Sequence, residues 1–248
     1  MCFHYALSAE AQKTANRFNS AFAKAHAYKK TFHASGFNHP IMPVIADAKP
    51  EEFSFFQWGL IPFWVKNETD ANEIKTKTLN ARADTIFERA SFRQAIRSRR
   101  CIIPASGFFE WREFKGEKYP YYISLRDEEL MGFGGIWEEW TDKTGTGEII
   151  YSFSIITTDA NPLMEKIHNT KKRMPFILPP GAEHEWLNPA LTQNELAEII
   201  QPLDEDLMQA HTISKLITSR SMNSNVPEVT DKFDYPELQT DENLFSSL

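Results

Sequence analysis

The chain has 248 residues, of which 42% are hydrophobic and 25% are charged, so it can bury a core as one large domain or two small ones. Its two cysteines, Cys2 and Cys101, form no CxxC pair, which argues against a disulfide framework and against a structural zinc site. The N-terminus has no basic segment before an apolar run, and no stretch reaches membrane-spanning length. We therefore expect a cytoplasmic protein with no metal, cofactor or membrane contact.

Charge is distributed unevenly along the chain. The formal net charge of −7 argues against a nucleic-acid partner, but residues 182–248 hold 13 acidic against 3 basic residues. Residues 75–100 hold eight basic residues against two acidic ones. A local basic stripe is the footprint that binding to a phosphate backbone requires. The simpler interpretation of such a run is a solvated helix face.

Helical spacing of apolar residues predicts helices over residues 8–28, from Asp84 or Thr85 to about Arg97, from Asn161 to about His168, and over 182–200 with a break at Asn188. Residues 31–45 contain a glycine and two prolines, and we expect an irregular loop there. Residues 67–78 are polar, which predicts an exposed segment.

Apolar and β-branched runs bounded by turn residues predict strands at 53–61, 101–111, 119–125, 131–140, 149–158, 176–178 and 211–218. Consecutive runs of this kind indicate an antiparallel meander or barrel. We predict an α+β fold, with one domain over residues 1–220 that has a mainly antiparallel β-sheet or barrel core and flanking helices. Residues 221–248 are predicted to be an acidic tail, packed on the surface or partly disordered, and we expect a monomer.

The first two residues have a chemistry of their own. If Met1 is removed, Cys2 carries a thiol and an α-amine on neighbouring atoms, with pKa values of roughly 8.5 and 8. Such an aminothiol condenses with an aldehyde through a Schiff base and then closes a thiazolidine ring. The alternative is that Cys2 is only start-site context.

Several other residues have both a reactive and a structural interpretation. Glu110 lies between Phe109 and Trp111, where it either faces solvent or is desolvated, with a raised pKa suited to proton transfer. Trp58 and Trp64 are either core residues or stacking platforms for nucleic-acid bases. Asn80 could end a turn, and His168 could interact with a helix dipole.

Five segments occur in a definite order: Cys2 after Met1, Trp58–Trp64 (WGLIPFW), Leu79–Asp84 (LNARAD), Arg100–Trp111 (RCIIPASGFFEW), and Ile167-His168 with Arg173–Leu178 (RMPFIL). Together they resemble the SRAP family, named for SOS-response-associated peptidases, over residues 1 to about 220. The resemblance implies a protein that removes its own Met1 and shields abasic sites in single-stranded DNA. Shielding in this family is a thiazolidine crosslink between the terminal cysteine and the ring-opened sugar.

The resemblance also assigns roles to residues. Cys2 matches the nucleophile, Asn80 the amide that positions amine and sugar, Glu110 the general acid and base, and His168 the histidine that exchanges a proton with the sugar oxygen. Arg82 matches an arginine that contacts phosphate, and Thr157 falls where the family often has a hydroxyl. The remaining candidates for DNA contact are Arg89 in the basic stripe, Trp58, Trp64, Arg173 and Pro40.

The chain departs from the family pattern in two places. Phe3 and His4 replace the usual Gly-Arg after the cysteine, and Asn169–Lys172 lengthen the connection between His168 and Arg173. Two other functions remain open from the residues alone. One is an N-terminal-nucleophile amidohydrolase or peptidase that acts on a small substrate through Cys2. The other is a non-catalytic module that binds single-stranded DNA.

Overall fold

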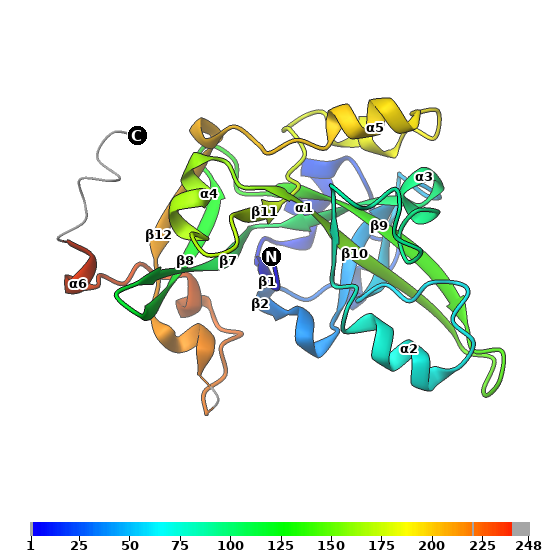
Figure 1. Cartoon of the computed structure of the whole chain (residues 1–248), viewed down its shortest axis with the longest axis horizontal. Coiled ribbons are helices and arrows are strands. Elements are labelled where there is room, and N and C mark those ends of the chain that lie inside the picture. The colour runs from blue at the N-terminus through cyan, green and yellow to red at the C-terminus, as the bar shows by residue number, and fades with distance from the viewer. Residues whose placement is uncertain (1, 220, 240–248) are drawn as a thin grey trace.

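The computed structural model describes residues 2–219 and 221–239, and these form two sheets flanked by short helices (Figure 1). The first sheet has the strand order β12-β8-β7-β1-β2. Its strands are β1 (His4–Leu7), β2 (Thr31–Ser35), β7 (Gly107–Phe114), β8 (Glu117–Leu125) and β12 (Met208–Thr212).

The second sheet has the order β11-β10-β4-β3-β6-β9, and β9 also pairs with β10, so that five of its strands close into a ring. Its strands are β3 (Ile41–Ala46), β4 (Phe53–Trp58), β6 (Arg100–Ala105), β9 (Met131–Thr141), β10 (Ile149–Asp159) and β11 (Arg173–Pro175), with β5 (Asn80–Arg82) attached to β10. All pairings are antiparallel except those of β10 with β4 and β5. The predicted α+β fold, with an antiparallel sheet and barrel core, is confirmed.

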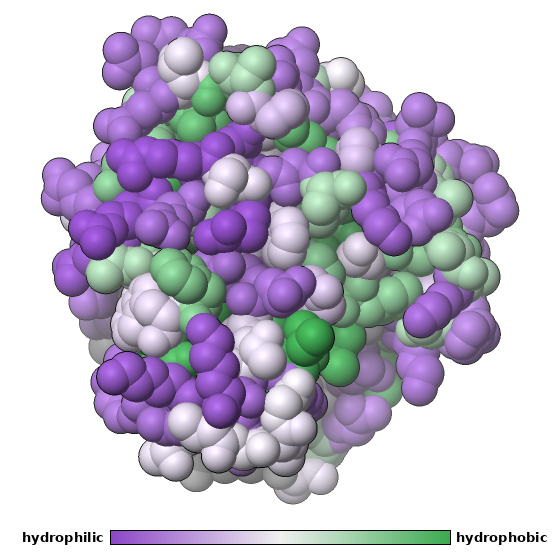
Figure 2. All heavy atoms as spheres, turned by 90° about the vertical axis from the view of Figure 1, so that its right-hand side faces the viewer, coloured by the Kyte–Doolittle hydropathy of each residue, from purple (hydrophilic) through white to green (hydrophobic). Residues whose placement is uncertain are grey.

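The helices are α1 (Ala11–Phe18), α2 (Glu68–Lys75), α3 (Ala95–Ser98), α4 (Pro162–Ile167), α5 (Gln193–Ile199) and α6 (Pro236–Gln239). The break predicted within 182–200 is present, because a 3₁₀-helix over Glu183–Leu187 precedes α5. Among the described residues, no helix has the length and apolar character needed to cross a bilayer. Figure 2 shows one side of the molecule, where hydrophilic residues cover most of the surface and apolar residues form small separate patches.

Residues 31–45 do not form the predicted loop. They form β2 and β3, which are joined by a short 3₁₀-helix over Gly36–Asn38. The glycine on which the loop prediction rested is the first residue of this helix. A Cβ atom at Gly36 would lie 3.2 Å from the Trp58 indole, so the glycine serves close packing. Ile41–Ala46 pairs with β4 along its length and with β6 at its end.

The helix predictions were too long in two places and missed α2. The first helix ends at Phe18, where Asn19 adopts a left-handed conformation with φ of 48°. Residues 85–94 form turns, and only Ala95–Ser98 is α-helical. The polar segment 67–78 contains α2, whose N-cap Asn67 accepts a hydrogen bond from the Asp70 backbone N–H. The basic stripe is therefore not one helix face.

The described part of the acidic tail packs against the first sheet. Val229 is fully buried, the backbone N–H of Phe233 donates to Thr212 O, and the Tyr235 hydroxyl donates to Ile213 O. The last part of the predicted tail, 240–248, lies outside the described residues. β1 lies at the centre of the molecule, between β7 and β8 on one side and β10 on the other (Figure 1), and it fixes where the chain begins.

Candidate active site

Cys2 is fully buried two residues before the start of β1. β1 pairs with β7, the strand that carries Glu110, at Tyr5 and Phe108, and Cys2 lies close enough to Glu110 for the carboxylate charge to act on its thiol. The Cys2 thiol donates a weak hydrogen bond to the His4 carbonyl oxygen, with a sulfur–oxygen distance of 3.8 Å. Burial raises the pKa of the Cys2 thiol, and the charge of Glu110 raises it further. The thiol is thus held protonated beside a carboxyl group.

Glu110 and His168 form the titratable pair of the site. The Glu110 carboxyl group is 4% exposed, and its Oε2 lies 3.8 Å from His168 Nε2. Burial raises the pKa of Glu110 to about 7 and lowers the pKa of His168 to about 4. At neutral pH, Glu110 is therefore close to half-protonated and His168 is neutral. The pair can therefore donate and accept a proton at neutral pH.

The end of α4 fixes the orientation of the His168 ring. Asn161 caps the helix by accepting from the Met164 backbone N–H, and His168 N–H closes the last turn onto Met164 O at 2.7 Å. His168 Nδ1 lies 2.8 Å from the carbonyl oxygen of Arg173, so we assign the proton to Nδ1. Nε2 then presents its lone pair toward Glu110.

Asn80 and Arg82 lie on β5, which is held beside β10 by parallel pairing at Ile155 and Thr157. Both polar atoms of the Asn80 amide are shielded from solvent and have no hydrogen-bond partner among the described residues. An unpaired buried amide costs about 1–3 kcal/mol, so a ligand that pairs with it gains affinity. The exposed Arg82 guanidinium pairs with Asp84, and its Nε lies 3.1 Å from Oδ1 of that residue. A phosphate would have to compete with this carboxylate.

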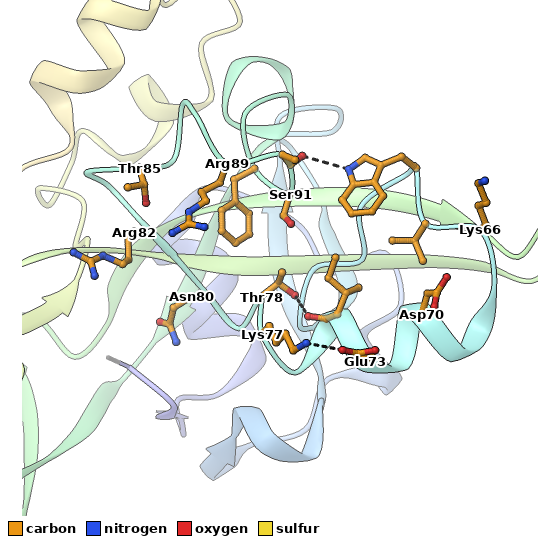
Figure 3. Close-up of a pocket in the computed structure, with 15 residues that line it drawn as sticks. Lys66, Asp70, Glu73, Lys77, Thr78, Asn80, Arg82, Thr85, Arg89 and Ser91 are labelled. Atoms are coloured by element: carbon orange, nitrogen blue, oxygen red, sulfur yellow. Dashed lines mark hydrogen bonds and ion pairs between the residues drawn. The ribbon is translucent and has the colours of Figure 1, made fainter.

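A cavity of about 850 Å³, termed the Asn80 cavity, runs from β5 to α2. Figure 3 shows Asn80 and Arg82 at one end and Lys66 at the other, with Thr85, Arg89 and Ser91 opposite Lys77, Glu73 and Asp70. Trp64 also lines it, with an indole N–H that donates to Ala90 O at 3.3 Å. Cationic side chains and a partly exposed indole thus line one concave surface.

A second cavity, of about 710 Å³, contains Glu110 and is termed the Glu110 cavity. His168 lines it, and the other residues around it include Phe3, His4, Trp111, Lys118, Lys171 and Lys215. A chain of contacts joins it to the Asn80 cavity. Arg173 Nη2 donates to both the carbonyl and the hydroxyl of Thr157, opposite Arg82 in the sheet, while the Arg173 carbonyl holds His168.

A family model described as "SOS response associated peptidase (SRAP)" matches residues 1–220. The chain belongs to the SRAP family. It is 38% identical to the abasic site processing protein YoqW of Bacillus subtilis, over 93% of this chain and 99% of that protein. It is 30% identical to the abasic site processing protein HMCES of Xenopus tropicalis, over 74% of this chain and 58% of that protein. The crystal structure of a protein from Bacteroides thetaiotaomicron aligns with a TM-score of 0.88 and 42% identity, over 94% of this chain and 100% of that one.

In this SRAP-family chain, three of the predicted DNA-contact residues lie elsewhere than expected. Trp58 is a core residue: it is fully buried, stacks on Phe153, and donates from its indole N–H to Leu79 O, so it offers no face to a base. Thr157 is buried and supports Arg173 instead of lining a cavity. Pro40 lies apart from both named cavities, in a smaller one of about 260 Å³ beside His33 and Asn225.

Arg173 lies at 6% exposure between the two acidic residues Asp159, at 3.3 Å, and Asp84, at 3.9 Å. Its guanidinium is therefore held by protein groups, while Arg82, Arg89 and Trp64 are exposed and line the Asn80 cavity. Two residues that line the same cavity as Glu110, Lys171 and Lys215, were not predicted from the sequence, and neither was the contact of His4 with His33. The basic run Lys171-Lys172-Arg173 was the one feature of the sequence that could have indicated cationic side chains in this cavity. Among the described residues, no group of three or more His, Cys, Asp or Glu side chains could hold a metal ion.

Proposed function

We propose that this SRAP-family protein processes abasic sites in single-stranded DNA, as the names of its relatives suggest, by a covalent crosslink through Cys2. The observation that carries the proposal is the burial of Cys2 beside the Glu110–His168 pair, whose carboxyl pKa of about 7 suits proton transfer at neutral pH. Proton exchange at an aldehyde and at an amine is the chemistry that an abasic sugar and a terminal aminothiol require.

The steps follow from the groups present. Hydrolysis of the Met1–Cys2 peptide bond, which we propose the protein catalyses itself, adds one water and frees the Cys2 α-amine. Glu110 and His168 return a proton to the ring oxygen of the sugar as the C1 hydroxyl loses one, which gives the open-chain aldehyde. The amine adds to the aldehyde carbon, and one water leaves to form an imine. The thiol then adds across the imine, with sulfur bonding to carbon and the thiol proton passing to nitrogen.

DNA would lie along the Asn80 cavity. Arg82 and Arg89 can neutralise phosphates there, and the Trp64 indole, 45% exposed, can stack on a base next to the lesion. The unpaired Asn80 amide can hydrogen-bond the amine or the open sugar. An abasic nucleotide offers no base to read, so backbone contacts and stacking are the means of recognition that remain. Four cationic side chains against two acidic ones, next to an exposed indole, favour DNA over the small amide substrate of a hydrolase.

The test is to mix purified full-length protein with abasic single-stranded DNA and to look for a heat-stable adduct on a denaturing gel. We expect an adduct from the unmodified protein and from Cys101→Ala, which removes the other buried thiol. We expect none from Cys2→Ala. An adduct of normal yield from Cys2→Ala would overturn the proposed chemistry.

A further inference from the structure

A row of hydrogen bonds runs from the C-terminal segment to the first strand. Ser224 Oγ lies 2.7 Å from His33 Nδ1, and His33 Nε2 lies 2.9 Å from His4 Nδ1. The next residue of the same segment, Asn225, accepts from the backbone N–H groups of Phe32 at 2.7 Å and His33 at 3.2 Å. Residues 224–225 therefore hold both the backbone of β2 and the imidazole ring of His33 (orange segment beside β2 in Figure 1).

The row ends at the reactive terminus. The His4 carbonyl accepts the hydrogen bond of the Cys2 thiol, and His4 pairs with Ser35 across β1 and β2. The His4 ring lines the cavity that contains Glu110 and His168. A displacement of the His4 backbone would therefore move the group that orients the Cys2 thiol.

Apolar rings enclose the row. His4 meets the Trp111 ring edge-on at 5.1 Å between centroids, and His33 meets Phe109 edge-on at 5.5 Å. His33 is the titratable group that faces His4 directly. The titratable groups that line the cavity with His4 are Glu110, Glu113, Glu117, Lys118, His168, Lys171 and Lys215. Burial lowers the pKa of both His4 and His33 to about 4, so both rings are neutral at neutral pH.

Neutral rings are what this geometry requires. A ring-to-ring hydrogen bond needs an N–H on one imidazole and a lone pair on the other. Because His33 uses both of its nitrogens, the direction of the bond with Ser224 fixes which tautomer each histidine adopts. If both rings were protonated, two N–H groups and two like charges would face each other at 2.9 Å, and the row would break.

We propose that Ser224, His33 and His4 are positioning residues for the Cys2 terminus, which makes residues 224–225 a working part of the reactive site. This inference rests on the proposed function for its role in crosslinking. The row itself is a property of the free protein. None of the three residues is assigned to touch the sugar.

The experiment uses full-length protein and compares Ser224→Ala, Ser224→Thr and His33→Phe with Ser221→Ala, a control in the same segment whose hydroxyl contacts only Ser219 among the described residues. The measurements are the single-turnover crosslinking rate at saturating abasic DNA from about pH 5 to 8, the dissociation constant for intact single-stranded DNA, and imidazole nitrogen chemical shifts. Circular dichroism and thermal unfolding confirm that each variant folds.

We expect Ser224→Ala and His33→Phe to slow crosslinking about tenfold, because small misplacements of a nucleophile are costly, while DNA affinity stays unchanged. Ser224→Ala should shift the His33 and His4 nitrogen signals, and Ser224→Thr should restore both the signals and the rate. Ser221→Ala should match the unmodified protein. Unchanged crosslinking rates and pH profiles in folded Ser224→Ala and His33→Phe would overturn the inference.

Failure of the proposed function gives a different result. If the unmodified protein forms no adduct, the crosslinking proposal is wrong, and the row is then judged by iodoacetamide alkylation of Cys2. If the row of hydrogen bonds holds the Cys2 terminus in place, Cys2 should be alkylated faster in Ser224→Ala than in the unmodified protein. Ser224→Thr should restore the original rate. Equal alkylation rates in these proteins and Ser221→Ala would overturn the positioning role as well.

Discussion

At the residue scale, the proposed chemistry depends on one carboxyl group, whose surroundings bring its pKa to about neutral pH. Glu110 lies on β7 between two aromatic residues, and burial raises its pKa from 4.5 to about 7. Below that pH it can donate a proton, and above it the carboxylate can accept one. His168 cannot replace it, because its pKa lies at about 4 and its ring is neutral over the same range.

Glu110→Gln should slow crosslinking by about a hundredfold or more, because an amide cannot transfer the proton. The unmodified protein should lose rate as the pH rises through about 7, where Glu110 gives up its proton. This loss of rate at alkaline pH should be absent from Glu110→Gln. Single-turnover crosslinking rates measured across the pH range test this. Glu139→Gln, an exposed carboxylate on β9, is the control and should behave as the unmodified protein. The same alkaline limb in Glu110→Gln would assign it to another group.

Trp64 is the exposed aromatic of the Asn80 cavity. Trp64→Ala should weaken binding of undamaged single-stranded DNA by about 1–3 kcal/mol, the worth of one stacked base. Fluorescence anisotropy at fixed salt measures the dissociation constant. Tyr151→Ala removes an aromatic of similar exposure that does not line the cavity, so its affinity should be unchanged. An equal loss of DNA affinity in the two variants would show that Trp64 does not contribute to the binding surface.

At the element scale, the proposed reactive groups lie on or next to interior strands of the first sheet, the short strand β5 and the end of α4, and sequence patterns predicted these elements unevenly. The strand with Glu110 and the helix that ends at His168 were predicted in place, since their apolar runs and the Asn161-Pro162 start are local signals. β2 and β3 were missed, because glycine and proline near Pro40 suggested a loop while the pairing that makes them strands comes from distant residues. The burial of Trp58 is likewise set by its neighbours in space.

Asn161→Ala tests whether α4 positions His168. Loss of the N-cap should lower the free energy of unfolding by about 1 kcal/mol, and loss of the hydrogen bond from Asn161 to Leu203 O should lower it further. The crosslinking rate should fall as well. Urea unfolding measures the stability, and the gel assay measures the rate. Thr192→Ala removes the capping box of α5, away from the site, and should cost about 1 kcal/mol with no change in rate. A rate loss of the same size in both variants would show that stability alone is responsible.

At the scale of the whole molecule, residues far apart in the sequence meet around β1 and β2. Cys2 precedes β1 and lies near Glu110, and Ser224 and Asn225 hold β2, the strand next to β1. The proposed site residues come from separate elements, and their placement depends on long-range pairing and packing that no local pattern encodes. The chemistry proposed for Cys2 and Glu110 could be inferred from the residues and was made specific by the family resemblance, whereas the role proposed for Asn80 rests on the resemblance alone. The contact of His33 with His4 had no sequence signal, because it depends on register alone.

Folding should be coupled to pH through the buried histidines. The pKa of His33 falls from 6.5 to about 4 on burial, as do those of His4 and His168, so the unfolded chain binds more protons between these pH values. Stability should therefore fall as the pH drops through this range. Glu110 contributes with the opposite sign, since its raised pKa favours the folded state at low pH and loses that contribution as the pH rises through about 7. Urea midpoints in His33→Phe should depend less on pH than in the unmodified protein, and an identical dependence would contradict this account.

The central claim is that the freed terminus of Cys2 is the group that captures the sugar. The most direct measurement is tandem mass spectrometry of the N-terminal peptide from protein reacted with abasic single-stranded DNA and then digested. We expect Met1 to be absent and Cys2 to carry the sugar remnant, with a mass equal to the sum of the two reactants less one water. A crosslinked peptide that retains Met1, or an adduct on a lysine such as Lys171 with Cys2 unmodified, would contradict it.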